Sequence, residues 1–246
     1  MTRHDTTSAM RLRPRRRVGS MRLVVVGVML VCTIPAGTAQ KPTPEQCGLD
    51  CVIARVGEAR ARLRTLTARF NHHRAYPQLG IVDTPQSGRL WIRRDSTELD
   101  ARLEMNAPDE RIIVVRGGSF VFYQPRLRQA MVGDLDNHRS DDSNLGFLTF
   151  LLSDVSSLQR TYRVELAGSG SSIVTLALTP RIEAAGPYRS VELEISTESW
   201  LPVRQRLDEV NGSRQYIELK ISATNNALDD ELFRLQLPKH VKRIPI

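Results

Sequence analysis

The chain has 246 residues, of which 41% are hydrophobic and 5% aromatic, and this length suits one domain with a sizeable core. Its formal charge of +8 suggests an anionic partner, but residues 1–39 alone contain seven arginines and one aspartate. The other 28 basic and 26 acidic side chains are interspersed, whereas nucleic-acid binding needs a concentrated basic face. Composition therefore argues against a nucleic-acid-binding protein.

Residues 1–39 have the features of an export signal. A basic region at residues 13–17 precedes an apolar run at residues 23–34, which is too short to cross a bilayer of about 30 Å. A Gly-Thr-Ala sequence then predicts cleavage after Ala39. Translation starts at the first residue or at Met21, and an uncleaved membrane anchor is the alternative reading. We expect residues 40–246 to form one domain.

The three cysteines have different expected fates. Cys32 follows Val31, whereas the acylated cysteine of a bacterial lipoprotein follows a small residue, so we expect Cys32 to be removed with the signal. Cys47 and Cys51 remain. In an oxidising compartment they would pair as a disulfide, but a Cys47 already inside a helix would strain that bond. Both the disulfide and two reduced thiols therefore stay open.

A long amphipathic helix is predicted for residues 50–72. Its apolar residues recur at alternating spacings of four and three, which places them on one face. These residues are Val52, Val56, Ala59, Leu63, Leu66 and Phe70. His72 and His73 would then end the helix as solvated side chains that complement the helix dipole, rather than as metal ligands.

After a loop at residues 76–87, the hydrophobic pattern changes to a period of two, which is typical of strands. Gly117-Gly118 and Asn211-Gly212 predict tight hairpins between antiparallel neighbours. The predicted strands are residues 88–94, 98–105, 111–116, 119–124, 128–134, 161–167, 172–179, 189–196, 201–210, 214–223 and 233–237.

One predicted helix interrupts the strands at residues 144–153. It follows Asp141, Asp142 and Ser143, a good N-cap region, and it is almost entirely apolar. Its side chains would line a cavity or a lid, and ordinary core packing is the alternative.

Two predicted strands, at residues 111–116 and 119–124, are apolar on both faces. A flat sheet with one face in water would instead alternate polar and apolar residues. A strongly curved sheet wrapped around helices would bury one face and leave room for an apolar ligand. We therefore expect a mainly β (α+β) fold around an apolar cavity.

Four stretches of the chain, in this order, carry a resemblance to a known family. They are residues 63–70, 88–94, 117–130 and 225–241. Together they resemble the periplasmic outer-membrane lipoprotein carriers of the LolA type. Asp95 and His240 depart from that pattern, which has proline and glycine at these positions. The resemblance implies an unclosed antiparallel half-barrel of about eleven strands, lidded by helices.

The resemblance also implies a function. Such carriers are monomers that take triacylated lipoproteins from an inner-membrane ABC transporter, cross the periplasm of a didermic bacterium and deliver them to an outer-membrane acceptor. They need no cofactor or metal, and the chain has none of the common nucleophile or phosphate-binding motifs. Carriers or sensors of glycolipid or phospholipid resemble the same half-barrel and are the alternative.

The resemblance assigns a lid-locking role to Arg94. Arg94 shares strand parity with Leu90 and Ile92, so its guanidinium would need acceptors such as the carbonyl groups of a lid helix. The alternative is an arginine at a strand end in water. The side chains expected to line the lipid cavity are Leu90, Ile92, Leu103, Met105, Phe120, Phe122, Leu148, Leu151 and Leu152.

Overall fold

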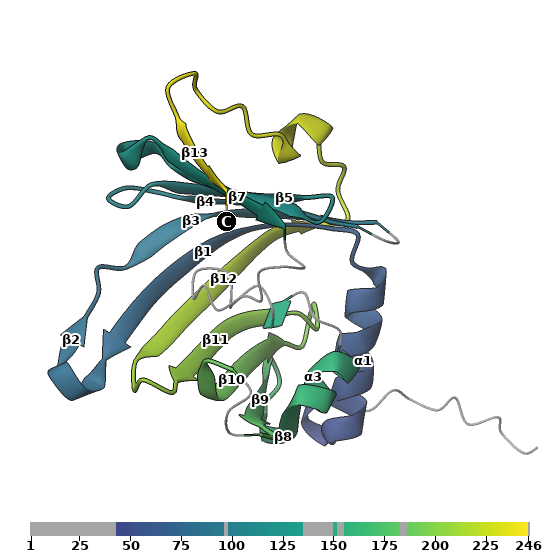
Figure 1. The fold of residues 1–246 in the computed structure, drawn as a ribbon. Coiled ribbons are helices and arrows are strands. Elements are labelled where there is room, and N and C mark those ends of the chain that lie inside the picture. The colour runs from purple at the N-terminus through teal and green to yellow at the C-terminus, as the bar shows by residue number, and fades with distance from the viewer. Residues whose placement is uncertain (1–42, 96–97, 135–149, 152–154, 183–185, 246) are drawn as a thin grey trace, which may run out of the picture. The chain divides into compact units, whose positions relative to one another are not determined.

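One sheet of thirteen strands dominates the computed structural model of the protein (Figure 1). The structure describes residues 43–95, 98–134, 150–151, 155–182 and 186–245. All of them belong to one compact unit that extends over residues 41–246. The predicted signal segment, residues 1–39, lies outside the described residues.

Nearly all neighbouring strands run antiparallel, and the last strand, which is parallel to its neighbour, is the exception. The strands are β1 (Thr65–Tyr76), β2 (Ile81–Val82), β3 (Gln86–Arg94), β4 (Leu99–Met105), β5 (Arg111–Arg116), β6 (Ser119–Gln124), β7 (Gln129–Asp134), β8 (Tyr162–Ser169), β9 (Ile173–Pro180), β10 (Tyr188–Ser196), β11 (Pro202–Glu209), β12 (Arg214–Thr224) and β13 (Lys242–Pro245).

The strand order shows that the sheet is open. It runs β13-β7-β6-β5-β4-β3-β1-β12-β11-β10-β9-β8, and β2 pairs with β1 beside this path. Among the described strands, β8 and β13 each have a neighbour on one side only, so the two edges do not join. The prediction of a mainly β, unclosed antiparallel half-barrel with helices is confirmed, although thirteen strands replace the expected eleven.

The predicted helix over residues 50–72 is wrong in its second half. Helix α1 (Leu49–Arg62) ends there, and the chain continues directly into β1. Leu66 and Phe70 fit a helical period of four, but with Ala68 between them they also fit a period of two. This segment is a strand because β1 pairs with β3 on one side and with β12 on the other.

The described helical residues are few. Helix α3 (Val155–Thr161) was not predicted. Phe150 and Leu151 are helical, but the rest of the helix predicted at residues 144–153, with Leu148 and Leu152, lies outside the described residues. Four short 3-10 turns complete the list: η1 (Pro44–Gln46), η2 (Pro77–Leu79), η3 (Pro125–Leu127) and η4 (Asp230–Phe233).

The strand predicted at residues 233–237 is also wrong. The Asp229 carboxylate accepts a hydrogen bond from the Glu231 backbone N–H at 2.9 Å and so caps η4 instead. The Phe233 ring is buried and lies 4.7 Å from the guanidinium of Arg93 on β3. The chain returns to the sheet only later, as β13.

Both predicted hairpins are present. Gly117 and Gly118 have φ angles of 54° and 77°, which side chains with a Cβ rarely adopt. In the β11–β12 hairpin, Gly212 has a φ of 86°. The Asn211 side chain contributes differently, because its Oδ1 accepts a hydrogen bond from the Ser213 backbone N–H at 2.8 Å.

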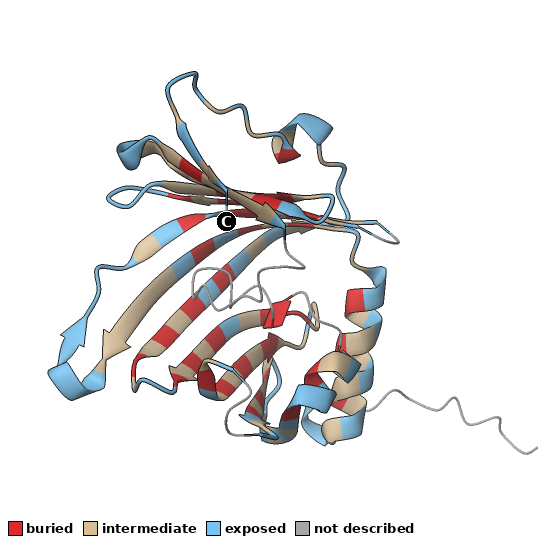
Figure 2. Cartoon of the chain, viewed as in Figure 1, coloured by how far each residue is buried: buried red, intermediate tan, exposed pale blue. Residues whose placement is uncertain are grey.

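Buried and more exposed residues alternate along the strands, as Figure 2 shows for β10, β11 and β12. Strand register places most of the buried side chains on one side of the sheet, which we call the inner face, whereas Val114 and Ala130 are buried on the other side. Val52 and Val56 of α1 belong to the same core. The apolar residues of the inner face include Leu66, Ala68, Phe70, Leu90, Ile92, Ala101, Leu103, Met105, Ile113, Val115, Phe120, Phe122, Val174, Leu176, Leu178, Val191, Leu193, Ile195, Leu207, Ile217 and Leu219.

We predict that Gly88→Ala destabilises the protein by about 1–3 kcal/mol. A Cβ at Gly88 would lie 2.1 Å from the Glu104 backbone oxygen and 2.4 Å from the Phe70 ring. Gly57→Ala, in α1, is the matched control, because a Cβ at this position would have no atom beyond the neighbouring helix backbone within 4 Å. It should stabilise the protein by about 0.5–1 kcal/mol. Urea unfolding measures both, and an unchanged midpoint for Gly88→Ala would contradict the close packing.

Candidate functional site

The inner face contains the six strand residues that the sequence assigned to a lipid cavity. Register places Leu90 opposite Leu103, and Leu103 opposite Ile113, whose other neighbour is Phe122. The structure thus brings Leu90, Ile92, Leu103, Met105, Phe120 and Phe122 together, each at most 9% exposed. Leu151 joins the same cluster, whereas Leu148 and Leu152 lie outside the described residues.

The second half of the inner face was missing from the sequence-based site. Leu176, Leu193 and Ile217 extend the apolar surface across β9, β10 and β12. Their alternation with polar residues correctly predicted strands. It did not show which of the two sides of each strand lies on the same face of the sheet as Leu90. Only the pairing of β1 with both β3 and β12 joins the two halves.

A cluster of polar side chains lies at one end of the inner face, and we call it the polar cluster. Arg74 Nη2 lies 3.0 Å from Glu209 Oε1. The Ser213 hydroxyl donates to Glu209 Oε2 at 2.6 Å, and Gln215 Nε2 also donates to this carboxylate. His72 Nε2 lies 3.0 Å from Gln215 Oε1. The opposite charges of Arg74 and Glu209 thus pair within the cluster, which lowers the cost of burying them.

The electrostatics of the polar cluster follow from these contacts. Burial opposes ionisation of Glu209, but hydrogen bonds from Ser213 and Gln215 and the charge of Arg74 outweigh it, so the pKa of Glu209 lies below its ordinary value. Burial lowers the pKa of His72, although its hydrogen bond to Gln215 acts in the opposite direction.

The prediction that His72 and His73 decorate a helix end is wrong. Both residues lie on β1, and successive side chains of a strand point to opposite faces. His72 joins the polar cluster. The ring of His73 stacks on Tyr216 at a centroid distance of 4.8 Å. Partners distant in sequence therefore decide the role of each histidine.

Arg94 is the last residue of β3 and is half-buried. Its backbone N–H donates to the Arg64 carbonyl oxygen at 2.7 Å. With acidic side chains that include Glu98 and Asp230, it lines a polar pocket of about 470 Å³. Its parity with Leu90 and Ile92 agrees with the prediction, and its contact with a lid stays a prediction.

Arg60 is an arginine that the sequence reasoning missed. It follows Val52 and Val56 at a spacing of four on α1 and is only 6% exposed. Its Nη2 donates a hydrogen bond to the Phe150 carbonyl oxygen. The spacing could have revealed it, but the predicted apolar stripe passed through Ala59 and Leu63 instead. Arg60 joins α1 to the helical residues Phe150 and Leu151.

Cys47 and Cys51 form a disulfide in the structure, with a Cα–Cα distance of 5.3 Å. Cys47 precedes α1, Gly48 is the N-cap residue, and Cys51 lies in the first turn. Because Cys47 is outside the helix, the two side chains can meet. The bond fixes the start of α1 against the segment before it.

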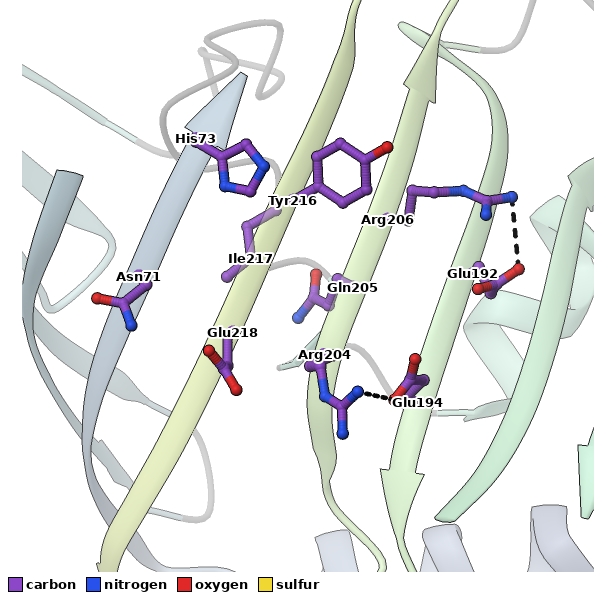
Figure 3. Close-up of a pocket in the computed structure, with 10 residues that line it drawn as sticks. All are labelled: Asn71, His73, Glu192, Glu194, Arg204, Gln205, Arg206, Tyr216, Ile217 and Glu218. Carbon is purple, nitrogen blue, oxygen red and sulfur yellow. Dashed lines mark ion pairs between the residues drawn. The ribbon is translucent and has the colours of Figure 1, made fainter. Parts of the chain in front are cut away.

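A groove of about 320 Å³ lies on the opposite, outer side of β1, β10, β11 and β12 (Figure 3). Arg204 pairs with Glu194 at 2.8 Å, and Arg206 pairs with Glu192 at 3.4 Å. The stacked His73 and Tyr216 rings complete its wall. This charged lining is unsuited to acyl chains, in contrast to the inner face.

Within the described residues, no group of three or more His, Cys, Asp or Glu side chains could hold a metal ion. Judged by length and hydropathy, none of the described helices could serve as a membrane-spanning segment.

The comparison with protein families decides the relationship. Residues 61–236 match the outer membrane lipoprotein carrier protein LolA family. The chain belongs to the LolA family. Members of this family are carriers and binding proteins rather than enzymes and act outside the cytoplasm, and the chain has their lipid- and lipoprotein-binding fold.

The solved structure of MucB shows a similar fold at low sequence identity. MucB is 15% identical with a TM-score of 0.50, and the match covers 78% of this chain but 64%, less than two thirds, of MucB. The lipoprotein LppX of Mycobacterium tuberculosis is 15% identical with a TM-score of 0.43, and the match covers 74% of this chain and 99% of LppX. No curated protein matches the sequence.

We predict that Glu209→Gln flattens the dependence of stability on pH in the acid range. The carboxylate of Glu209 stabilises the fold fully above its unfolded-state pKa of about 4.5, and this stabilisation is lost as the pH falls through the lower folded-state pKa. The urea midpoint measured between pH 7 and pH 3 should therefore fall less steeply in the variant.

Glu165→Gln, at an exposed position of β8, controls for the loss of one negative charge. It should keep the acid dependence of the wild type. An equally steep loss of stability in Glu209→Gln and wild type would show that Glu209 contributes nothing to acid sensitivity.

Proposed function

We propose that this protein carries the acyl chains of lipoproteins across the periplasm by holding them against the inner face. One observation carries the proposal: in a chain of the LolA family, the apolar inner face is continuous from β6 to β9. Acyl chains offer no polar groups, so an extended apolar surface is the complement they need.

The energetics of acyl chains favour such a carrier. Each methylene group removed from water contributes about 0.8 kcal/mol, so a long chain exposed to water is very unfavourable. The carrier must nevertheless release its cargo. Apolar contacts are non-directional, and a small number of hydrogen bonds at the helices can shift the balance between a loaded and an empty state.

The proposed route begins with export. In this proposal, residues 1–39 are removed as a signal peptide, and residues 40–246 form the mature carrier. The disulfide between Cys47 and Cys51 supports an oxidising compartment such as the periplasm. An inner-membrane ABC transporter would supply the lipoprotein, and an outer-membrane lipoprotein would accept it from the monomeric carrier.

Mass spectrometry of the protein purified gently from the periplasm tests the cargo. We expect a co-purifying acylated lipoprotein, because its chains would be shielded by the inner face. Glycolipid or phospholipid in its place would establish the alternative cargo. Protein that carries no lipid, and takes up none from detergent-solubilised lipoproteins, would contradict a carrier of either kind.

We predict that Arg94→Leu still accepts a lipoprotein but releases it poorly. If the Arg94 guanidinium stabilises the closed, empty carrier, its removal lowers the driving force for unloading. A two-step transfer assay, with loading and release measured separately, detects this difference.

Arg89→Leu is the matched control, because Arg89 lies on the same strand but on its exposed side, paired with Glu104 at 2.8 Å. Its transfer should equal that of the wild type. Normal release by Arg94→Leu would refute the gate role without affecting the proposed cargo.

A further inference from the structure

The inner face contains a buried primary amide, that of Gln205, whose hydrogen-bonding groups have no partner among the described residues. Gln205 of β11 is 2% exposed. In the described part of the chain, neither its Nε2 nor its Oε1 has a hydrogen-bond partner. Register places it between Leu193 of β10 and Ile217 of β12, which are both buried. A primary amide is thus set into an apolar surface.

The neighbouring strand shows that this fold can satisfy a buried glutamine. Gln215 of β12, which is 0% exposed, donates to the Glu209 carboxylate and contacts His72 through its Oε1. An unpaired buried amide costs the full free energy of its desolvation, so such groups usually have a partner. The contrast between the two glutamines leaves the amide of Gln205 available to a ligand.

The chemistry of the amide limits what that ligand can be. Gln205 presents one donor group and one acceptor together. An extended peptide residue presents its N–H and its C=O on the same side, as residues of paired strands do when they exchange two hydrogen bonds. An N-acylated residue keeps this N–H, an ester replaces it with oxygen, and a free ammonium group would be costly to bury.

We propose that Gln205 binds the N-acylated residue at which the acyl chain of a cargo joins its peptide. Oε1 accepts the amide N–H of that residue, and Nε2 donates to its carbonyl oxygen. The chain then lies on apolar neighbours such as Leu193 and Ile217. The inference rests on the proposed carrier function and adds a chemical class to it: amide-linked rather than only ester-linked acyl groups.

Two probes that differ in one group test the proposal. They are N-hexadecanoylglycine methyl ester and its analogue in which an ester oxygen replaces the amide N–H. Displacement of a fluorescent fatty acid from the purified full-length protein measures both affinities. We expect the wild type to bind the amide about five- to tenfold more tightly, as one additional hydrogen bond would give.

Gln205→Leu should lose this preference while it still binds the ester probe. Its urea midpoint should rise, because an unsatisfied amide is removed. Tyr188→Phe is the matched control, because the Tyr188 hydroxyl is also buried without a partner within the described residues. Tyr188 is paired with Glu209, which lies four residues after Gln205 on β11. This variant should keep the preference for the amide.

The outcomes separate the two proposals. Equal affinities of the wild type for the two probes, or a preference that persists in Gln205→Leu, would overturn the role of Gln205 and leave the carrier function intact. A wild-type protein that binds neither probe would overturn the carrier function and this inference with it.

Discussion

Strand register is the constraint on which the rest of this structure depends. Side chains alternate along each strand, so a slip of one residue would move a whole apolar set to the other face. Leu90, Leu103 and Phe122 share a face only because each strand pair holds its register. The same alternation gives the outer side its ion pairs, such as those between Arg204 and Glu194 and between Arg206 and Glu192.

Local patterns in the sequence were sufficient for the hairpin formed by β5 and β6. Residues 111–116 and 119–124 form strands with the predicted bounds, and the glycines between them form the predicted hairpin. The pattern failed where two periods coincide, as at Leu66 and Phe70, because only the neighbouring strands distinguish helix from strand there. It also failed at β13, whose partner β7 lies more than a hundred residues earlier in the chain.

The candidate site divides in the same way. Its apolar half was predictable because hydrophobic residues at every second position of a strand indicate a buried face. Its polar residues were not predictable, because their roles depend on partners that are distant in sequence. His72 contacts Gln215, and Arg74 donates a hydrogen bond to Glu209. Arg60 and Gln205 were missed for a related reason. Each occupies a position at which its element has apolar residues, and its burial among apolar neighbours shows that its polar group needs a hydrogen-bond partner.

The parallel strand β13 has a consequence for a protein of this kind. A sheet with two open edges, and with a large apolar face, is prone to pair with other chains. At one edge of the sheet, β13 pairs with β7, so the outermost strand there contains Lys242, Arg243 and Pro245. Charged side chains repel a second edge, and proline has no N–H to donate. Strand β13 thereby works against edge-to-edge pairing of this side of the sheet with another chain.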